Sequence, residues 1–114
     1  MGRMDYLKDM PIAVLGGGAV GKTCAADMKL AGKNVRLYDM MPFAETSLAN
    51  VEKTGILLDG VQHNLYCFER SGRAFFNMVT SEMAEAVKGA GLIVVAAPAF
   101  AHEPFFKQLV PLLE

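Results

Sequence analysis

The chain has 114 residues, of which 53% are hydrophobic and 20% are charged, a composition that suits one compact α/β domain and excludes a disordered chain. Its 11 basic and 12 acidic residues give a net charge of −1, which excludes a general electrostatic attraction to nucleic acid or to an anionic membrane. Any anionic ligand must therefore be held by a local site.

Membrane, secretion and metal-binding patterns are not found in the sequence. The longest apolar run, residues 92–100, is about half as long as a bilayer span, and the N-terminal segment MGRMDYLKDM does not resemble a signal peptide. Cys24 and Cys67 form no CxxC pair, and no histidine stands at metal-ligand spacing from them, so both are expected to be buried thiols. We therefore predict a cytoplasmic protein without a metal centre.

The first part of the chain predicts a strand, a helix and a second strand. The apolar run from Pro11 to Leu15 ends directly in Gly16, as a buried parallel strand would. A helix is expected to follow and to end before Gly32, and a strand is expected from Asn34 to Tyr38. The helix is expected to turn Gly21, Cys24, Met28 and Ala31 inward and Lys22, Ala26, Lys29 and Lys33 outward.

The middle of the chain predicts a second helix and a hairpin. Pro42 is expected to open a helix that Gly55 ends. From Ile56 to Thr80, short apolar runs alternate with turn residues, which predicts a hairpin-like excursion and then a short strand at 76–79.

The last part of the chain predicts a helix, a strand and a final helix. Ser81 is the expected N-cap of the first helix, the strand is expected from Leu92 to Ala97, and Pro104 is expected to open the final helix. The side chains expected to face inward are Met83, Val87, Ala90, Phe105, Leu109 and Leu112. The alternation of strands and helices predicts a mainly parallel, doubly wound sheet in one domain spanning residues 1–114.

One glycine-rich loop, in the segment IAVLGGGAVGKT, satisfies two phosphate-binding patterns. Gly16, Gly18 and Gly21 spell G-x-G-x-x-G, the pattern of dinucleotide-binding domains. Gly16 and Gly21 with Lys22 and Thr23 also spell G-x-x-x-x-G-K-T, the pattern of P-loop nucleotide hydrolases. The two patterns predict different ligands.

Under the dinucleotide hypothesis each glycine has a separate task. Gly16 permits the tight turn, Gly18 lets the backbone approach the pyrophosphate, and Gly21 allows the helix to pack closely on the strand. The helix that begins near Ala19 offers unpaired N–H groups and the positive end of its dipole to the phosphates. No cationic side chain is then required.

An acidic residue at the end of the second predicted strand favours the dinucleotide. Asp39 stands 18 positions after Gly21, close to the spacing of about 20 residues expected for a carboxylate that accepts hydrogen bonds from ribose hydroxyls. The same carboxylate would repel the 2′-phosphate of NADP, and no basic residue follows it before Lys53. We therefore predict NAD as the cofactor, with NADP as the alternative.

The P-loop hypothesis would place Lys22 at the phosphates and Thr23 at magnesium. The other motifs of that class are missing from the sequence, because no N-K-x-D or D-x-x-G motif follows the loop and Asp59 precedes a predicted turn. Lys22 is accordingly expected to be a solvated surface lysine. A P-loop NTPase stays as an alternative.

Small residues follow the last predicted strand, at the edge where parallel sheets bind ligands. Ala97, Pro98 and Ala99 would let the backbone lie against a cofactor, whereas His102 and His63 are expected to be surface or capping residues rather than acid-base catalysts. No catalytic or metal-binding residue is predicted. The complete predicted cofactor-binding set is Gly16, Gly18, Ala19, Val20, Gly21, Asp39, Met40, Ala97, Pro98 and Ala99.

Over nearly its whole length the chain resembles the N-terminal domain of the opine dehydrogenases, the octopine and nopaline dehydrogenase family among the 6-phosphogluconate-dehydrogenase-like oxidoreductases. The resemblance is carried by IAVLGGGAVG, by AGKNVRLYDM and above all by VTSEMAEAVKGAGLIVVAAPAFAHEPFFKQLVPLL, which closes its apolar strand in PAFAH. Ketopantoate reductase and glycerol-3-phosphate dehydrogenase share the glycine loop but resemble the PAFAH end less closely.

The resemblance implies a Rossmann-type domain and the reductive condensation of an α-keto acid with an amino acid, with a reduced nicotinamide cofactor as hydride donor. Gly16, Gly18, Ala19, Val20 and Asp39 match the family's cofactor-binding positions. Many members have asparagine and glycine where this chain has Ala19 and Val20, so the phosphate contacts are expected to differ in detail.

The family places its catalytic histidine and its substrate-binding residues in a helical second domain, and the sequence ends at residue 114. The chain is therefore expected to be the N-terminal part of a longer enzyme and to bind the cofactor without turnover. A non-catalytic nucleotide-sensing module, completed by a partner chain or a second copy at the open sheet edge, is the alternative from another class.

Overall fold

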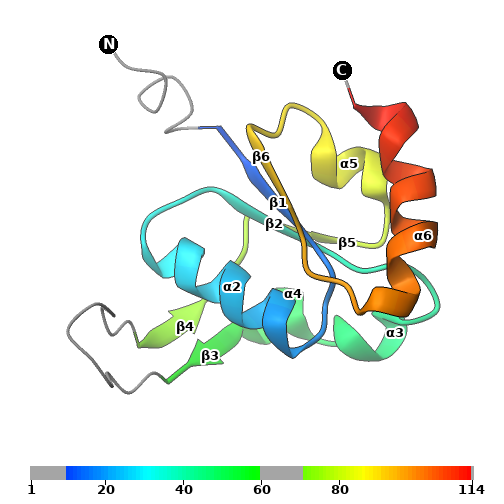
Figure 1. Cartoon of the computed structure of the whole chain (residues 1–114). Helices are drawn as coiled ribbons and strands as arrows, with labels where there is room; N and C mark the ends of the chain where they lie inside the picture. Colours follow the sequence, from blue (N-terminus) through cyan, green and yellow to red (C-terminus); the bar gives the residue numbers. More distant parts are fainter. Residues whose placement is uncertain (1–9, 60–70, 114) are drawn as a thin grey trace, which may run out of the picture.

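The computed structural model describes residues 10–59 and 71–113. Its centre is a four-stranded parallel sheet in the order β5–β2–β1–β6 (Figure 1). The strands are β1 (Ile12–Leu15), β2 (Val35–Tyr38), β5 (Met78–Thr80) and β6 (Leu92–Val95). The predicted α/β class and the parallel pairing are thus confirmed.

Helices and one small hairpin surround this sheet. The helices are α2 (Ala19–Leu30), α3 (Ala44–Ser47), α4 (Val51–Thr54), α5 (Met83–Val87) and α6 (Ala99–Leu109), which continues into the 3₁₀ turn η1 (Val110–Leu112). The hairpin pairs β3 (Ile56–Leu58) antiparallel with β4 (Gly72–Ala74), as the sequence predicts. Residues 60–70 between these strands, with His63 and Cys67, lie outside the described residues.

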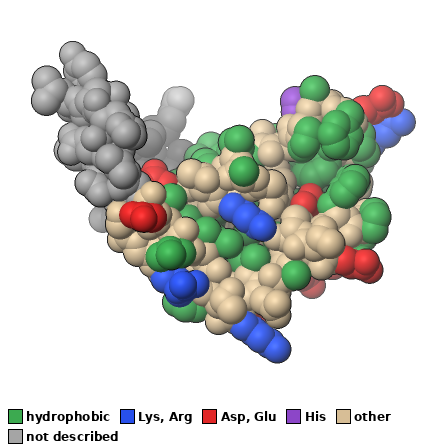
Figure 2. Space-filling model, turned by 90° about the horizontal axis from the view of Figure 1, so that it is seen from below, with side chains coloured by type: hydrophobic (Ala, Val, Ile, Leu, Met, Phe, Trp, Pro, Cys, Tyr) green, Lys and Arg blue, Asp and Glu red, His purple; other side chains and the backbone are tan. Residues whose placement is uncertain are grey.

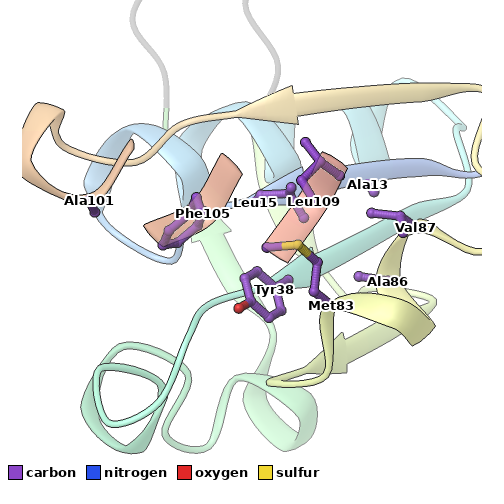
Figure 3. Close-up of a cluster of buried hydrophobic side chains, with 9 residues drawn as sticks. All are labelled: Ala13, Leu15, Tyr38, Met83, Ala86, Val87, Ala101, Phe105 and Leu109. Carbon is purple, nitrogen blue, oxygen red and sulfur yellow. The ribbon is translucent and has the colours of Figure 1, made fainter. Parts of the chain in front are cut away.

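Alternating side chains divide the core into two layers, one on each face of the sheet. On one face, Leu15 of β1 and Tyr38 of β2 pack against Phe105 of α6 and Met83 of α5 (Figure 3). The Tyr38 and Phe105 rings meet edge to face, with their centroids 5.7 Å apart. On the other face Val14, Val35 and Leu37 pack against α2 and α4, and the members of that layer are Val14, Ala25, Val35, Leu37 and Val51.

The period of two along each strand explains this division. In β1 and β2, neighbouring residues point to opposite faces, so Leu15 and Val14 enter different layers, as do Tyr38 and Leu37. Helices on both faces require strands that are apolar on both sides, and β1 and β2 satisfy this except at Arg36. Val35 and Leu37, two residues apart in β2, lie on the same face.

The predicted outer face of the first helix is partly wrong. Ala26, expected to face solvent, is fully buried, while Ala31 lies exposed beyond the helix end. The reason is that α2 contacts β3 and β4 as well as the central sheet, so the hairpin covers a second side of the helix. Cys24, expected to be buried, is only partly so; this burial, and secondarily the charge of Asp27, raises the pKa of its thiol.

The single helix predicted between Pro42 and Gly55 is two short helices. Asn50 adopts the left-handed conformation, with φ of 61°, between α3 and α4. Asparagine tolerates this conformation better than most residues, so the chain turns there instead of continuing one helix. The neighbouring strand β5 is also displaced by one or two residues from its predicted position at 76–79.

Three expectations near the C-terminus are corrected. Ser81 is not the N-cap of α5, because Glu82 occupies that position and the Thr80 hydroxyl accepts the Glu82 N–H at 2.9 Å. Pro104 does not open the last helix, which begins five residues earlier at Ala99, directly after Pro98. Leu112 is exposed because η1 changes the direction of the chain after the buried Leu109.

Among the residues described, no helix combines the length and apolarity that crossing a membrane requires.

Candidate functional site

The glycine loop lies where β1, β2 and β6 end, at what we call the carboxyl edge of the sheet. The Gly16 N–H donates to the Tyr38 carbonyl at 2.7 Å, and the Ala96 N–H donates to the Leu15 carbonyl at 2.8 Å. The order of the strands reverses between β1 and β6, since β2 and β5 follow on one side of β1 and β6 lies on the other. Open parallel sheets bind ligands at this position.

Gly16 and Gly21 are required by the packing of the loop itself. Gly16 has φ of +131°, and a Cβ there would lie 2.7 Å from the Ala96 carbonyl oxygen. A Cβ on Gly21 would overlap the carbonyl oxygen of Gly16. Gly21 therefore lets the start of α2 pack against the end of β1, as the dinucleotide pattern predicts, and Gly16 lets the loop pack against the end of β6.

Gly18 has the opposite environment. It is exposed, and a Cβ there would meet nothing within 4 Å. It is the N-cap residue of α2, and no side chain caps the helix. The first N–H groups of the helix therefore face open space with the positive end of the helix dipole, which is an arrangement that binds phosphate.

Asp39 is the one buried acidic residue among those described, with 7% of its surface exposed. Its Oδ1 accepts the Met40 N–H at 2.9 Å, and its Oδ2 accepts the Ser47 hydroxyl at 2.6 Å. The carboxylate lies beside the loop, because a Cβ on Gly17 would be 2.9 Å from Asp39 Oδ2. β2 thus ends with a carboxylate next to the backbone of the glycine loop.

Two hollows flank the glycine loop. The inner hollow, of about 220 Å³, is lined by Gly16, Gly17, Gly18, Asp39, Phe43, Thr46, Ser47, Ala97, Pro98, Phe100, Ala101 and Phe105. The outer hollow, of about 420 Å³, is lined by Gly18, Ala19, Val20, Val95, Ala96, Ala97 and Pro98. Both hollows share Gly18, Ala97 and Pro98, so an extended ligand can cross the loop from one to the other.

Apolar side chains form the walls of the inner hollow. Phe43, before α3, and Phe100, in the first turn of α6, are 47% and 76% exposed although both are aromatic. A flat aromatic ligand would remove such surface from water and stack on the rings. Asp39, Thr46 and Ser47 are the polar side chains among the described lining residues.

The start of α6 is fixed to the end of β6. His102 Nε2 lies 2.8 Å from the Ala97 carbonyl oxygen, and its ring meets the Phe106 ring edge to face at 6.2 Å. His102 does not line either hollow. Its contacts position the chain around Ala97 and Pro98, which agrees with the expectation of a surface or capping role.

The basic side chains of the described residues lie away from the site. None of the described residues that line the two hollows is Lys or Arg. The Arg36 guanidinium Nη1 instead donates to the carbonyl oxygens of Glu85, Ala86 and Lys88, at the end of α5, at 3.1, 3.1 and 2.6 Å. On the face shown in Figure 2, basic side chains are scattered singly and form no continuous patch.

Larger hollows lie away from the glycine loop. One of about 580 Å³ lies among α3, α4 and the end of β5, and another of about 490 Å³ lies between α5 and η1. Neither contains a residue of the glycine loop or Asp39. Within the described ranges 10–59 and 71–113, no three His, Cys, Asp or Glu side chains gather as a metal site would require.

Most of the predicted set gathers at this edge, and three members do not line it. Gly16, Gly18, Ala19, Val20, Asp39, Ala97 and Pro98 line one or both hollows. Gly21 lies behind the loop, Met40 contributes its N–H to Asp39 and packs against the core, and Ala99 is exposed outside both hollows.

The sequence interpretation missed Gly17, Phe43, Ser47 and Phe100. Gly17 carried a signal, because it is the middle residue of GGG and lies outside the G-x-G-x-x-G pattern. The other three reach the site only through the folding of α3 and α6 over the carboxyl edge. No local spacing predicts them.

The geometry of the loop also bears on the P-loop alternative. Residues 19–21, which would form half of a P-loop cradle, already belong to α2. Lys22 is the fourth residue of that helix and lines neither hollow. This arrangement differs from a loop that wraps around a phosphate.

Searches against protein-family models and against curated proteins find no match to the chain.

Proposed function

We propose that the chain is an NAD-binding domain of Rossmann type, from an oxidoreductase that resembles the opine dehydrogenases. The strand order β5–β2–β1–β6 supports this proposal, because it matches the order 3-2-1-4 of the first four strands of a doubly wound dinucleotide fold. Bound NADH would supply a hydride, and the protein would bind and orient the cofactor.

The observation that carries the proposal is the juxtaposition of the open N-terminus of α2 with the buried carboxylate of Asp39. The helix end suits a pyrophosphate, and Asp39 lies on the side where the adjoining ribose would follow. The adenine would then enter the inner hollow between Phe43 and Phe100, and the nicotinamide half would leave through the outer hollow. Each half of the ligand has a matching surface.

Cofactor choice follows from the charges. Asp39 is the ionisable residue among the described lining residues, and no lysine or arginine accompanies it. A 2′-phosphate would meet a carboxylate without any cation to balance it, so NAD is favoured over NADP. The described lining residues include no further acid or base, so we expect this chain alone to bind the cofactor without turnover. We expect the protein to work in the cytoplasm.

Calorimetric titration of the chain with NADH, NADPH, Mg-ATP and Mg-GTP tests the proposal. We expect NADH to bind more tightly than the other three ligands. Preference for Mg-ATP or Mg-GTP would support the P-loop alternative, and failure to bind NADH would overturn the proposal. Sustained NADH oxidation in the presence of pyruvate and an amino acid would contradict the expectation of binding without turnover.

A further inference from the structure

We propose that Ser47 is a positioning and specificity residue for the adenosine ribose, selecting a ribose whose 2′-hydroxyl is free. The inference rests on the proposed NAD site and assigns a role to a side chain on α3, outside the glycine loop and the end of β2. It is carried by the hydrogen bonds around Asp39 and by the space that Gly17 leaves.

The Asp39 carboxylate is held at two points. Met40 donates its N–H to Oδ1 at 2.9 Å, and Ser47 donates its hydroxyl to Oδ2 at 2.6 Å. A carboxylate offers about four lone-pair positions, so about two acceptor positions stay open for a ligand. The Ser47 bond fixes the direction in which these positions point.

Ser47 donates its hydroxyl proton to Asp39, so this proton is not available to a ligand. The hydrogen-bonding groups that remain on Asp39 and Ser47 decide which ligand they can recognise. A hydroxyl has one proton and two lone pairs, so Ser47 that donates to Asp39 offers only acceptors to the inner hollow. Thr46 is in the same state, because its hydroxyl donates to the Phe43 carbonyl at 3.1 Å. The polar side chains of the hollow, which we call its acceptor wall, therefore present only acceptors to a ligand.

An acceptor wall distinguishes the two cofactors. A ribose with free hydroxyls brings donors, which Asp39 and Ser47 can both accept. A 2′-phosphate brings acceptors and negative charge, which neither side chain can pair. Ser47 thus adds a second discriminating group to the carboxylate.

The environment of Gly17 is a second, independent observation that supports a role for the Asp39–Ser47 pair. A Cβ on Gly17 would lie 2.9 Å from Asp39 Oδ2, 2.9 Å from Ser47 Oγ and 3.0 Å from Leu48 Cδ2. Since Gly17 does not have a left-handed φ, the absence of a side chain there serves space rather than backbone conformation. The loop leaves room for the pair directly beside the proposed pyrophosphate position.

The test combines variants of the protein with changes in the ligand. Dissociation constants of wild type, Ser47→Ala and Ser47→Thr are measured by calorimetry with NADH, with its 2′-deoxyadenosine analogue and with NADPH. Ser81→Ala is the matched control, because Ser81 is an exposed serine that lines a different hollow. Thermal unfolding of each variant reports whether α3 stays in place.

We expect Ser47→Ala to weaken NADH binding about five- to tenfold, as for loss of one ordinary hydrogen bond. The loss should fall to less than about twofold with the 2′-deoxy analogue, and Ser47→Thr should restore NADH binding because it keeps the hydroxyl. Ser47→Ala should also reduce the preference for NADH over NADPH, and Ser81→Ala should behave like wild type.

Two results would overturn the role of Ser47. One is wild-type affinity for NADH in Ser47→Ala, and the other is an equal loss with NADH and with the 2′-deoxy analogue, which would show that the effect does not pass through the ribose hydroxyl. Failure of the wild type to bind NADH would instead overturn the proposed function. The two failures are therefore distinguishable.

Discussion

The two ends of the parallel sheet differ in how far their polar groups are hydrogen-bonded within the protein. At the amino end, the Ile12 N–H donates to the Asn34 carbonyl at 2.8 Å and the Gly91 N–H donates to the Pro11 carbonyl at 2.8 Å. Asn77 Oδ1 there accepts both the Val35 N–H, at 3.0 Å, and the Lys29 ammonium, at 2.7 Å. The protein's own atoms satisfy these groups, although Asn34 Oδ1 at the same end is buried without a hydrogen-bond partner among the described residues.

At the carboxyl edge the same sheet leaves groups open. No side chain caps α2, Gly18 faces empty space, and Asp39 keeps acceptor positions beyond those taken by Met40 and Ser47. An end that the protein satisfies internally contributes to stability, whereas unsatisfied donors beside a buried carboxylate gain from a ligand. The comparison predicts that substitutions at the two ends will separate stability from affinity.

The largest effect is expected within the loop, for Gly21→Ala. The added methyl group would overlap the Gly16 carbonyl oxygen, which is backbone and cannot move without displacing α2 from β1. We expect a loss of about 3 kcal/mol in the free energy of unfolding, measured by chemical denaturation.

Gly18→Ala is the matched control, because a methyl group there meets nothing. Its free energy of unfolding should lie within about 0.5 kcal/mol of the wild-type value. It should nevertheless bind NADH about tenfold more weakly, because the methyl group would occupy the position of the phosphate. Equal destabilisation of the two variants would remove the distinction between a packing glycine and a ligand-facing glycine.

Asp39→Asn should have the next largest effect, on affinity. Loss of the carboxylate weakens hydrogen bonds to the ribose by about 1.5–3 kcal/mol, or roughly ten- to a hundredfold in the NADH dissociation constant. The discrimination against NADPH should decrease as well, because the repelling charge is gone. Glu103→Gln, a change in an exposed carboxylate paired with Lys107, serves as control. Unchanged NADH affinity in Asp39→Asn would place the ribose elsewhere.

Asn77→Ala tests the amino end. It removes the acceptor of the Val35 N–H and of the Lys29 ammonium, so we expect a loss of about 1 kcal/mol in the free energy of unfolding. NADH affinity, measured on the folded protein, should stay within about twofold of wild type. A tenfold loss of affinity would show that the two ends are not independent.

Tyr38→Phe should have the smallest effect, and one that depends on pH. Burial chiefly, and then the negative charges of Asp39 and Glu82, raise the pKa of Tyr38 above its ordinary value. The unfolded chain therefore releases this proton first, so the stability that Tyr38 contributes is present below about pH 10 and decreases as the pH rises further. The variant keeps the aromatic contact with Phe105, so below pH 9 it should match wild type within about 1 kcal/mol.

Denaturation of wild type and Tyr38→Phe between pH 8 and pH 11 checks this effect. The stability of wild type should decrease more steeply with pH above about pH 10 than that of Tyr38→Phe. Parallel curves would contradict the inferred burial of a neutral phenol.

The sequence predicts most of the unit from β1 to β2, because its signals are local. An apolar run, a glycine pattern, a helix and a terminal Asp39 follow one another within one strand–helix–strand unit, and each has its own spacing rule. Gly16, Gly18 and Asp39 could therefore be identified without a structure.

The remaining part of the site depends on contacts between distant residues. Ser47 reaches Asp39 because Asn50 breaks the predicted helix and leaves α3 as one short turn over the carboxyl edge. Phe100 reaches the inner hollow because α6 starts at Ala99 and not at Pro104. The burial of Ala26 likewise depends on the hairpin that covers α2. Local periodicity contains no information on such contacts.

Amide chemical-shift mapping by NMR during an NADH titration tests the central claim most directly, because it compares both ends of the sheet in one sample. The largest shifts are expected at the N–H groups of Gly18, Ala19 and Val20 and at Met40, whose N–H reports on Asp39. The amides of Val35 and Asn77 should stay unchanged. Shifts that concentrate at the amino end, or around Met41 and Ser81 instead of the glycine loop, would contradict a dinucleotide site at the carboxyl edge.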